Sequence, residues 1–157
     1  MKKQSILFVC LGNICRSPAA EAIFLDLINK KGLNDSFIVD SAGTGSWHIG
    51  KKADKRMRIA SQKRGVEILS RARQINLNDF EKFTYIVAMD DSNYENIVNL
   101  KSRKSLSDFS SIKKIQNFRS IFQETEVPDP YFGGDEGFDH VLDILEDSVS
   151  CFLESIA

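Results

Sequence analysis

The sequence is poor in cysteine, and its charges almost cancel. It has three cysteines in 157 residues, and 21 basic side chains stand against 22 acidic ones. So few cysteines, odd in number, do not make a disulfide framework, and we therefore expect a reducing, cytoplasmic setting. Proteins specialised for nucleic acids or membrane surfaces usually carry a basic excess. We therefore expect no nucleic acid and no membrane as a partner.

Long hydrophobic runs, internal repeats and low-complexity tracts are also missing. No segment approaches the roughly 20 apolar residues that span a bilayer. Apolar residues still make up 42% of the chain, enough for a substantial core at this length. We find no linker, so the sequence predicts a single domain over residues 1–157.

Short apolar runs alternate with amphipathic segments along the chain. The runs suit strands buried on both faces, and the amphipathic segments show the 3, 4 and 7 spacing of helices. Predicted strands are residues 5–10, 36–41, 84–89 and, more weakly, 113–118; predicted helices are residues 18–31, 54–64, 92–101 and 138–156. Ser17 is expected to cap the first helix, Pro18 to begin it and Gly32 to end it. This alternation predicts an α/β fold with a parallel sheet and helices on both faces.

The segment after the first predicted strand reads Cys-Leu-Gly-Asn-Ile-Cys-Arg-Ser-Pro over residues 10–18. A cysteine ends the strand, and an arginine six positions later precedes the helix. A loop in this place turns backbone N–H groups toward an anion, and the helix N-terminus adds positive potential. The spacing alone is weak evidence, and the position between strand and helix strengthens it. The segment predicts a phosphate-binding loop at the carboxyl end of the sheet.

Three side chains of this loop fit nucleophilic catalysis on phosphate. The Cys10 thiolate would be the nucleophile, and Arg16 can grip two phosphate oxygens in a fork that lysine cannot form. Ser17 can donate a hydrogen bond to the sulfur and help it to leave in a second step. Gly12 is expected to permit an unusual backbone conformation. The alternatives are a structural strand-end cysteine beside a surface arginine, or a nucleotide-binding loop, whose Gly-x-x-x-x-Gly-Lys-Ser/Thr pattern is absent.

Expelling an alkoxide or phenoxide requires a proton donor. The segment Val-Pro-Asp-Pro-Tyr-Phe-Gly-Gly over residues 127–134 offers Asp129 between two prolines that stiffen it. Tyr131 would form a wall for an aromatic leaving group. An isolated Asp-Pro-Tyr segment is usually a turn, so this interpretation depends on the loop at residues 10–18.

Together these two segments resemble the low-molecular-weight protein tyrosine phosphatase family. The resemblance continues through residues 39–44, 72–75 and 88–93, and it covers nearly the whole chain in order. It implies a three-layer sandwich in which a four-stranded parallel sheet is flanked by helices on both faces. It also implies that no cofactor and no metal ion is used.

The resemblance further implies a role for each site residue. Cys10 would form a phosphocysteine intermediate, Arg16 would stabilise the transferring phosphoryl group, and Asp129 would act first as acid and then as base. Residues implied to bind substrate are Leu11, Gly12, Asn13, Ile14, Cys15, Trp47 and Tyr131. Asn13 and Ser41 would support the loop, and Cys10 and Cys15 would form a reversible disulfide under peroxide. Implied partners are phosphotyrosine proteins as substrates, with inorganic phosphate and other oxyanions as inhibitors.

The chain departs from some family members at two places. Phe132 stands where they have a second tyrosine after Asp-Pro, and Ser70 stands near a position where some vertebrate members carry a histidine. His48 and His140 are expected to be loop or surface residues. Trp47 could equally be a partly buried aromatic with no role in the site.

Three other functions compete with tyrosine phosphatase activity. An arsenate reductase of the same fold needs two more cysteines after the third strand, and the chain has none between Cys15 and Cys151. A protein arginine phosphatase carries threonine where this chain has Ile14, whose bulk favours an aryl ester. A non-hydrolysing phosphotyrosine-binding module would normally lack the nucleophile, the arginine or the acid.

Overall fold

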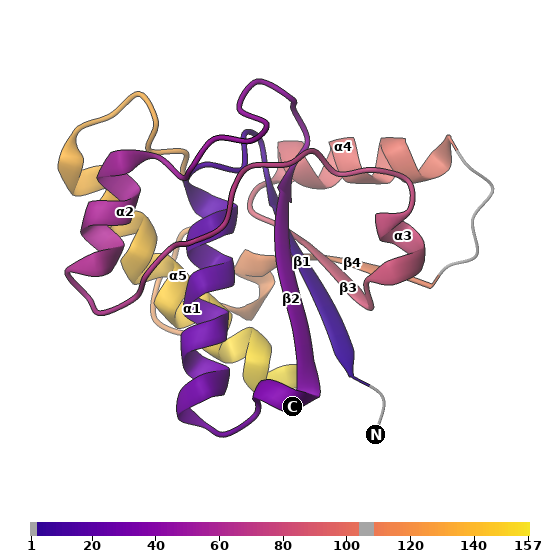
Figure 1. The fold of residues 1–157 in the computed structure, drawn as a ribbon, viewed down its shortest axis with the longest axis horizontal. Coiled ribbons are helices and arrows are strands. Elements are labelled where there is room, and N and C mark those ends of the chain that lie inside the picture. The colour runs from indigo at the N-terminus through magenta and orange to yellow at the C-terminus, as the bar shows by residue number, and fades with distance from the viewer. Residues whose placement is uncertain (1–2, 104–108) are drawn as a thin grey trace.

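The computed structural model describes residues 3–103 and 109–157 and contains a parallel sheet with strand order β2-β1-β3-β4. The strands are β1 (Gln4–Cys10), β2 (Phe37–Gly43), β3 (Tyr85–Ala88) and β4 (Ser111–Lys114). The α-helices are α1 (Arg16–Lys30), α2 (Lys55–Gln62), α3 (Asp79–Lys82), α4 (Asp91–Ser102) and α5 (Asp135–Ile156). Two short 3-10 helices are η1 (Asn34–Ser36) and η2 (Ile115–Phe118). Figure 1 shows the sheet between two layers of helices.

The central strand β1 is apolar on both faces because both faces are covered. Ile6 and Phe8 belong to a core shared with α1, α2 and α5, whereas Leu7 and Val9 belong to a second core shared with α3 and α4. All four side chains are fully buried. The predicted three-layer α/β sandwich with a four-stranded parallel sheet is therefore confirmed.

The predicted start of the first helix is wrong by two residues. α1 begins at Arg16, and Cys15 occupies the cap position without a side-chain hydrogen bond. Ser17 therefore lies in the first turn, fully buried, where its hydroxyl contacts Cys10 Sγ and the Ala42 carbonyl of β2 instead of capping the helix. Pro18 is the third helical residue, which the first turn tolerates because that N–H has no intrahelical partner. Gly32 has a φ of 68° just beyond the helix end, as predicted.

The fourth strand is shorter than predicted and begins earlier. β4 pairs with β3 alone and ends at Lys114, after which the chain turns into η2. In η2, Gln116 is buried and its side chain contacts Ser148 of α5 and the Glu124 carbonyl. These contacts with α5 replace further strand pairing. The short helix α3 has no counterpart in the sequence prediction, and α5 begins three residues before the predicted start.

The carboxyl ends of β1, β2 and β3 meet at one edge of the sheet. Cys10 at the end of β1 is in register with Gly43 at the end of β2, and Val9 is in register with Ala88 of β3. The loops that follow these strands lie together at the top of Figure 1, away from both chain ends. Among the described helices, none combines the length and the apolar composition needed to cross a bilayer.

Candidate active site

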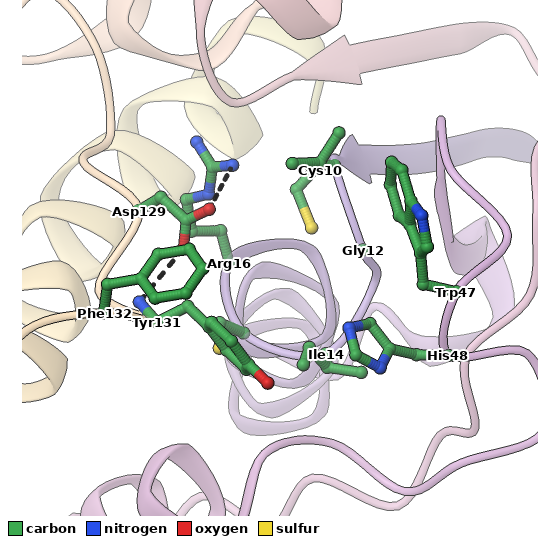
Figure 2. Close-up of a pocket in the computed structure, with 11 residues that line it drawn as sticks. Cys10, Gly12, Ile14, Arg16, Trp47, His48, Asp129, Tyr131 and Phe132 are labelled. Atoms are coloured by element: carbon green, nitrogen blue, oxygen red, sulfur yellow. Dashed lines mark hydrogen bonds and ion pairs between the residues drawn. The ribbon is translucent and has the colours of Figure 1, made fainter.

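A cavity of about 200 Å³ opens beyond the end of β1. Its lining residues are Cys10, Leu11, Gly12, Ile14, Cys15, Arg16, Trp47, His48, Asp129, Tyr131 and Phe132. In Figure 2 the Cys10 sulfur points into the cavity, with Arg16 and Asp129 on one side and Trp47 and His48 on the other. Segments far apart in the sequence therefore meet around one cysteine.

The segment 10–17, called here the phosphate loop, turns its carbonyl groups away from the cavity. The carbonyl oxygens of Cys10, Leu11 and Ile14 accept hydrogen bonds at 2.8–2.9 Å from the N–H groups of Thr44, Gly45 and Asp54. Within the described residues, the N–H groups of Leu11, Gly12, Ile14 and Cys15 have no hydrogen-bond partner. A curved loop with inward N–H groups ahead of a helix N-terminus is an anion site.

The unusual backbone conformation of this loop lies at Asn13, where φ is 57°, and not at Gly12 as predicted. Asparagine tolerates this left-handed region better than most residues. Gly12 has a different constraint, because a Cβ there would lie 3.0 Å from His48 Cδ2. A Cβ on Gly43 would lie 2.8 Å from the Leu11 carbonyl oxygen, so β2 must pass close to the loop without a side chain.

A buried hydrogen-bond network lies beneath the Cys10 sulfur. Sγ is 3.0 Å from Ser17 Oγ and accepts a hydrogen bond from Asn13 N at 3.3 Å. The Asn13 amide donates to Ser17 Oγ at 2.8 Å and to Ser41 Oγ at 3.0 Å. Cys10, Asn13, Ser17 and Ser41 are each at most 3% exposed. The shape of the loop is thus determined before any substrate arrives.

Two further residues extend this network, and the sequence analysis assigned them no role. The Arg73 N–H donates to Asn13 Oδ1 at 3.0 Å, and the Ser41 hydroxyl donates to Glu21 Oε1 at 2.6 Å. Burial raises the pKa of the Glu21 carboxyl. The neighbours of Glu21 on α1 are apolar and buried. A single glutamate among them was the sequence signal that could have revealed its role.

Arg16 lies across the cavity from Trp47 and is 2% exposed. Its Nη1 contacts Asp90 Oδ2 at 2.5 Å and donates to the Val127 carbonyl at 3.1 Å. Its Nη2 lies 3.5 Å from Asp129 Oδ2, an ion pair drawn in Figure 2. Asp90 also caps α4 through Asn93 N, so it links that helix to the arginine. Sequence reasoning assigned no role to Asp90, which lies two residues beyond the end of β3.

The segment 127–134, called here the Asp129 loop, carries no helix or strand. The Asp129 side chain is 38% exposed, and its Oδ1 accepts a hydrogen bond from Tyr131 N at 3.1 Å. The contact with Arg16 brings the carboxylate to the mouth of the phosphate loop. The structure therefore brings the predicted acid and the predicted nucleophile to the same cavity.

The walls of the cavity are aromatic and largely open to solvent. Trp47 is 66% exposed and Phe132 94% exposed, while Tyr131 is 36% exposed. The His48 ring lies 6.1 Å from the Tyr131 ring. His48 and Phe132 thus line the cavity, which the sequence analysis did not predict. His140 is a surface residue paired with Glu124 at 2.7 Å, as expected.

Cys15 lies on the floor of the cavity as a buried free thiol. Burial, reinforced by the negative charge of Asp54, raises the pKa of Cys15 far above its ordinary value. Cys10 is also a free thiol, and Cys151 lies on α5, outside the cavity lining. In the described part of the chain, no group of three or more His, Cys, Asp or Glu side chains could hold a metal ion.

Comparison with known proteins identifies relatives along the whole chain. Residues 5–157 match the family model described as low molecular weight phosphotyrosine protein phosphatase. The Schizosaccharomyces pombe protein of that name is 41% identical over 157 residues, covering 99% of each chain. A protein tyrosine phosphatase from Entamoeba histolytica, crystallised with Hepes in its active site, has a TM-score of 0.90 and 43% identity, covering 98% of this chain and 97% of its own. A Drosophila arginine phosphatase has a TM-score of 0.91 and 34% identity, covering 96% of each chain.

Proposed function

Because the chain belongs to the low molecular weight phosphotyrosine protein phosphatase family, we propose that it hydrolyses phosphotyrosine in proteins through a phosphocysteine intermediate. The observation that supports this most is the position of Cys10 Sγ. It lies 3.0 Å from the Ser17 hydroxyl, within a loop of unpaired N–H groups and in a cavity that Arg16 and Asp129 also line. The whole chain would act as one phosphatase domain.

In the first step, the Cys10 thiolate attacks phosphorus and the bond from phosphorus to the tyrosine oxygen breaks. The electron pair of that bond goes to the leaving oxygen, which takes a proton from Asp129. Arg16 and the loop N–H groups stabilise the charge on the three other phosphoryl oxygens. The present ion pair between Arg16 and Asp129 gives way to the phosphoryl group, which sits between them.

In the second step, water attacks the phosphocysteine and Asp129 accepts its proton. The phosphorus–sulfur bond breaks, and its electron pair returns to Cys10. The Ser17 hydroxyl, 3.0 Å from the sulfur, donates a hydrogen bond that stabilises the departing thiolate. Inorganic phosphate leaves, and it would inhibit the enzyme as other oxyanions would, because it fits the same loop.

The aromatic walls favour an aryl ester as substrate. Trp47, Tyr131 and Phe132 offer faces for the tyrosine ring once its phosphate sits in the loop. A cavity of about 200 Å³ has room for a phenyl phosphate and leaves the rest of the substrate protein outside.

A second candidate is the hydrolysis of phosphoarginine, and the likeness to the Drosophila arginine phosphatase favours it. Ile14 lines the cavity and supplies an apolar contact, which suits an aromatic ring better than a guanidinium. The ratio of kcat/KM for phosphotyrosine and phosphoarginine, measured on wild type and Ile14→Thr, separates the two. We expect phosphotyrosine to be preferred by wild type, with the preference reduced in the variant.

A reducing compartment such as the cytoplasm would keep the nucleophile active. Under peroxide, the Cys10 thiolate would become a sulfenic acid, and the Cys15 thiol would displace water from it to form a disulfide. A thiol reductant would restore both cysteines. The raised pKa of Cys15 supports this division of roles, because its protonated thiol reacts with peroxide more slowly than a thiolate.

The first experiment is a p-nitrophenyl phosphate assay at mildly acidic pH, with EDTA and a reductant present. Wild type should be active, and Cys10→Ser should lose turnover by at least about 10⁴-fold. Because Arg16 and the loop N–H groups remain, the variant should still bind inorganic phosphate. An active Cys10→Ser enzyme, or an inactive wild type, would refute the proposal, and an arsenate reduction assay would then come next.

A further inference from the structure

Arg56, the second residue of α2, contacts the backbone of the Asp129 loop on the C-terminal side of Asp129. Its Nη2 donates to the Tyr131 carbonyl at 2.9 Å. Upstream of Asp129, the loop is fastened to the sheet because Val127 N donates to the Met89 carbonyl at 2.9 Å. In residues 3–103 and 109–157, no other hydrogen bond connects the backbone of residues 130–133 with an element outside the loop. Arg56 therefore supplies the downstream attachment, and Figure 1 shows α2 beside this part of the chain.

The guanidinium of Arg56 is oriented by charge and by aromatic rings. The Asp54 carboxylate accepts hydrogen bonds from Nε at 3.2 Å and from Nη2 at 3.0 Å. The ring of Phe138, buried at the start of α5, has its centroid 4.6 Å from Arg56 Cζ, and the Tyr131 ring lies 5.7 Å away. A forked ion pair and two cation–π contacts leave the planar group little freedom.

The same turn is attached to the phosphate loop. Asp54 N donates to the Ile14 carbonyl at 2.8 Å, while the Asp54 carboxylate caps α2 through Arg56 N at 2.8 Å. Asp54 and Arg56 thus form a bridge, one end on the phosphate loop and the other on the Asp129 loop. The bridge therefore connects the loop that would hold the phosphate with the loop that carries Asp129.

We propose that Arg56 is a positioning residue that holds Asp129 within reach of the leaving oxygen. The proposal rests on the function proposed above, in which Asp129 donates the proton. Arg56 is not among the residues that line the cavity, so it acts through the loop and not on the substrate. A general acid needs hydrogen-bond reach to its target, and a displacement of about 1 Å costs on the order of a hundredfold in rate.

The test compares Arg56→Ala and Arg56→Lys on phenyl phosphate and p-nitrophenyl phosphate. The matched control is Arg58→Ala on the same helix, because the Arg58 Nε donates to the Ala53 carbonyl at 2.9 Å, outside the Asp129 loop. Arg56→Ala should lose on the order of tenfold or more in kcat/KM on phenyl phosphate and about twofold or less in kcat/KM on p-nitrophenyl phosphate, whose leaving group needs less protonation. Inhibition by inorganic phosphate should stay within about twofold of wild type, because the phosphate loop is intact.

Arg56→Lys should recover part of the loss, since an ammonium can still reach the Tyr131 carbonyl but cannot fork onto Asp54. If melting curves show that Arg56→Ala does not fold, the comparison of Arg56→Lys with wild type on the two substrates replaces it as the test. An equal loss on both substrates would overturn the proposal. So would a double variant with Asp129→Ala that is slower than Asp129→Ala alone. An inactive wild type would refute the proposed function as well, so the two failures are distinguishable.

Discussion

The two loops that face each other across the cavity are held in opposite ways. In the phosphate loop, Cys10, Asn13 and Ser17 are nearly inaccessible and bond to one another. Arg16 is equally buried and bonds to Asp90 and to the Val127 carbonyl. In the Asp129 loop, Phe132 is almost fully exposed, and Asp129 itself is more than one-third exposed. The half proposed to bind the anion is a buried network, and the half proposed to supply the proton is a surface segment with few attachments.

This difference separates two kinds of mutational effect. Damage to the buried network should slow every phosphate ester, because binding and attack occur there. Damage to the Asp129 loop should lower kcat/KM to an extent that depends on the leaving group, because Asp129 donates the proton to the leaving oxygen in the first step. The four predictions below run from the largest expected effect to the smallest.

Arg16→Ala should lower kcat/KM by on the order of 10³-fold on every substrate, because the guanidinium that stabilises the negative charge on the phosphoryl oxygens is removed. Steady-state kinetics and phosphate inhibition measure this. Arg16→Lys is the matched control, since it keeps the charge without the fork. An alanine variant with wild-type KM and wild-type affinity for phosphate would contradict the role given to Arg16.

Asp129→Ala should slow phenyl phosphate by on the order of 10²-fold and p-nitrophenyl phosphate much less. Values of kcat/KM measured across leaving groups of different acidity check this, and a uniform loss would mean that Asp129 only shapes its loop.

Asn13→Ala should destabilise the fold by about 2–3 kcal/mol and reduce kcat/KM by on the order of tenfold for all leaving groups. Alanine tolerates a φ of 57° poorly, the partly buried Arg73 N–H loses its acceptor, and the Ser41 hydroxyl loses one of its two hydrogen bonds. Urea unfolding measures the stability. Asn34→Ala, on the exposed helix η1, is the control, and equal stability of both variants would argue against the network.

Cys15→Ser should have the smallest effect, seen only after oxidation. After a peroxide pulse and reductant, wild type should regain most of its own starting activity, and the variant several-fold less, because over-oxidised Cys10 is not recovered. Non-reducing peptide mapping should find the Cys10–Cys15 disulfide in wild type. Equal recovery in both proteins would remove the protective role of Cys15.

Much of the binding half was predictable because it is local. A buried strand, a short loop and a helix follow one another in the chain, so Cys10, Arg16 and Ser17 could be placed from their order. The predictions that were wrong concern details that depend on contacts among several side chains. The sequence analysis put the unusual backbone conformation at Gly12, but the residue with the left-handed φ is Asn13. The hydrogen bonds of the Asn13 side chain to Ser17 and Ser41 offset the energetic cost of that conformation.

For the Asp129 loop, the sequence could offer a candidate acid but not its position relative to the phosphate loop. Asp129 between two prolines suggests an extended acid, but Arg56 and Asp90 give no local signal of their roles. Both act on residues more than 70 positions away, on Tyr131 and Arg16 respectively. The short strand β4 was misjudged for the same reason, because contacts with α5 decide where its pairing stops.

By itself, the sequence determined the alternation of strands and helices, the loop at the end of β1, and the choice of Cys10, Arg16 and Asp129 as candidates for nucleophile, phosphate ligand and acid. Hydrophobic spacing and strand-to-helix order carry that information along a few neighbouring residues. Only the tertiary structure decided how Asp129 faces the phosphate loop. It also decided that Asn13 and Ser41 are buried in contact with each other, and that Arg56 is the arginine that binds the Tyr131 carbonyl. Those contacts join segments that are distant in sequence, and their geometry exists only after the sheet and its helices have packed.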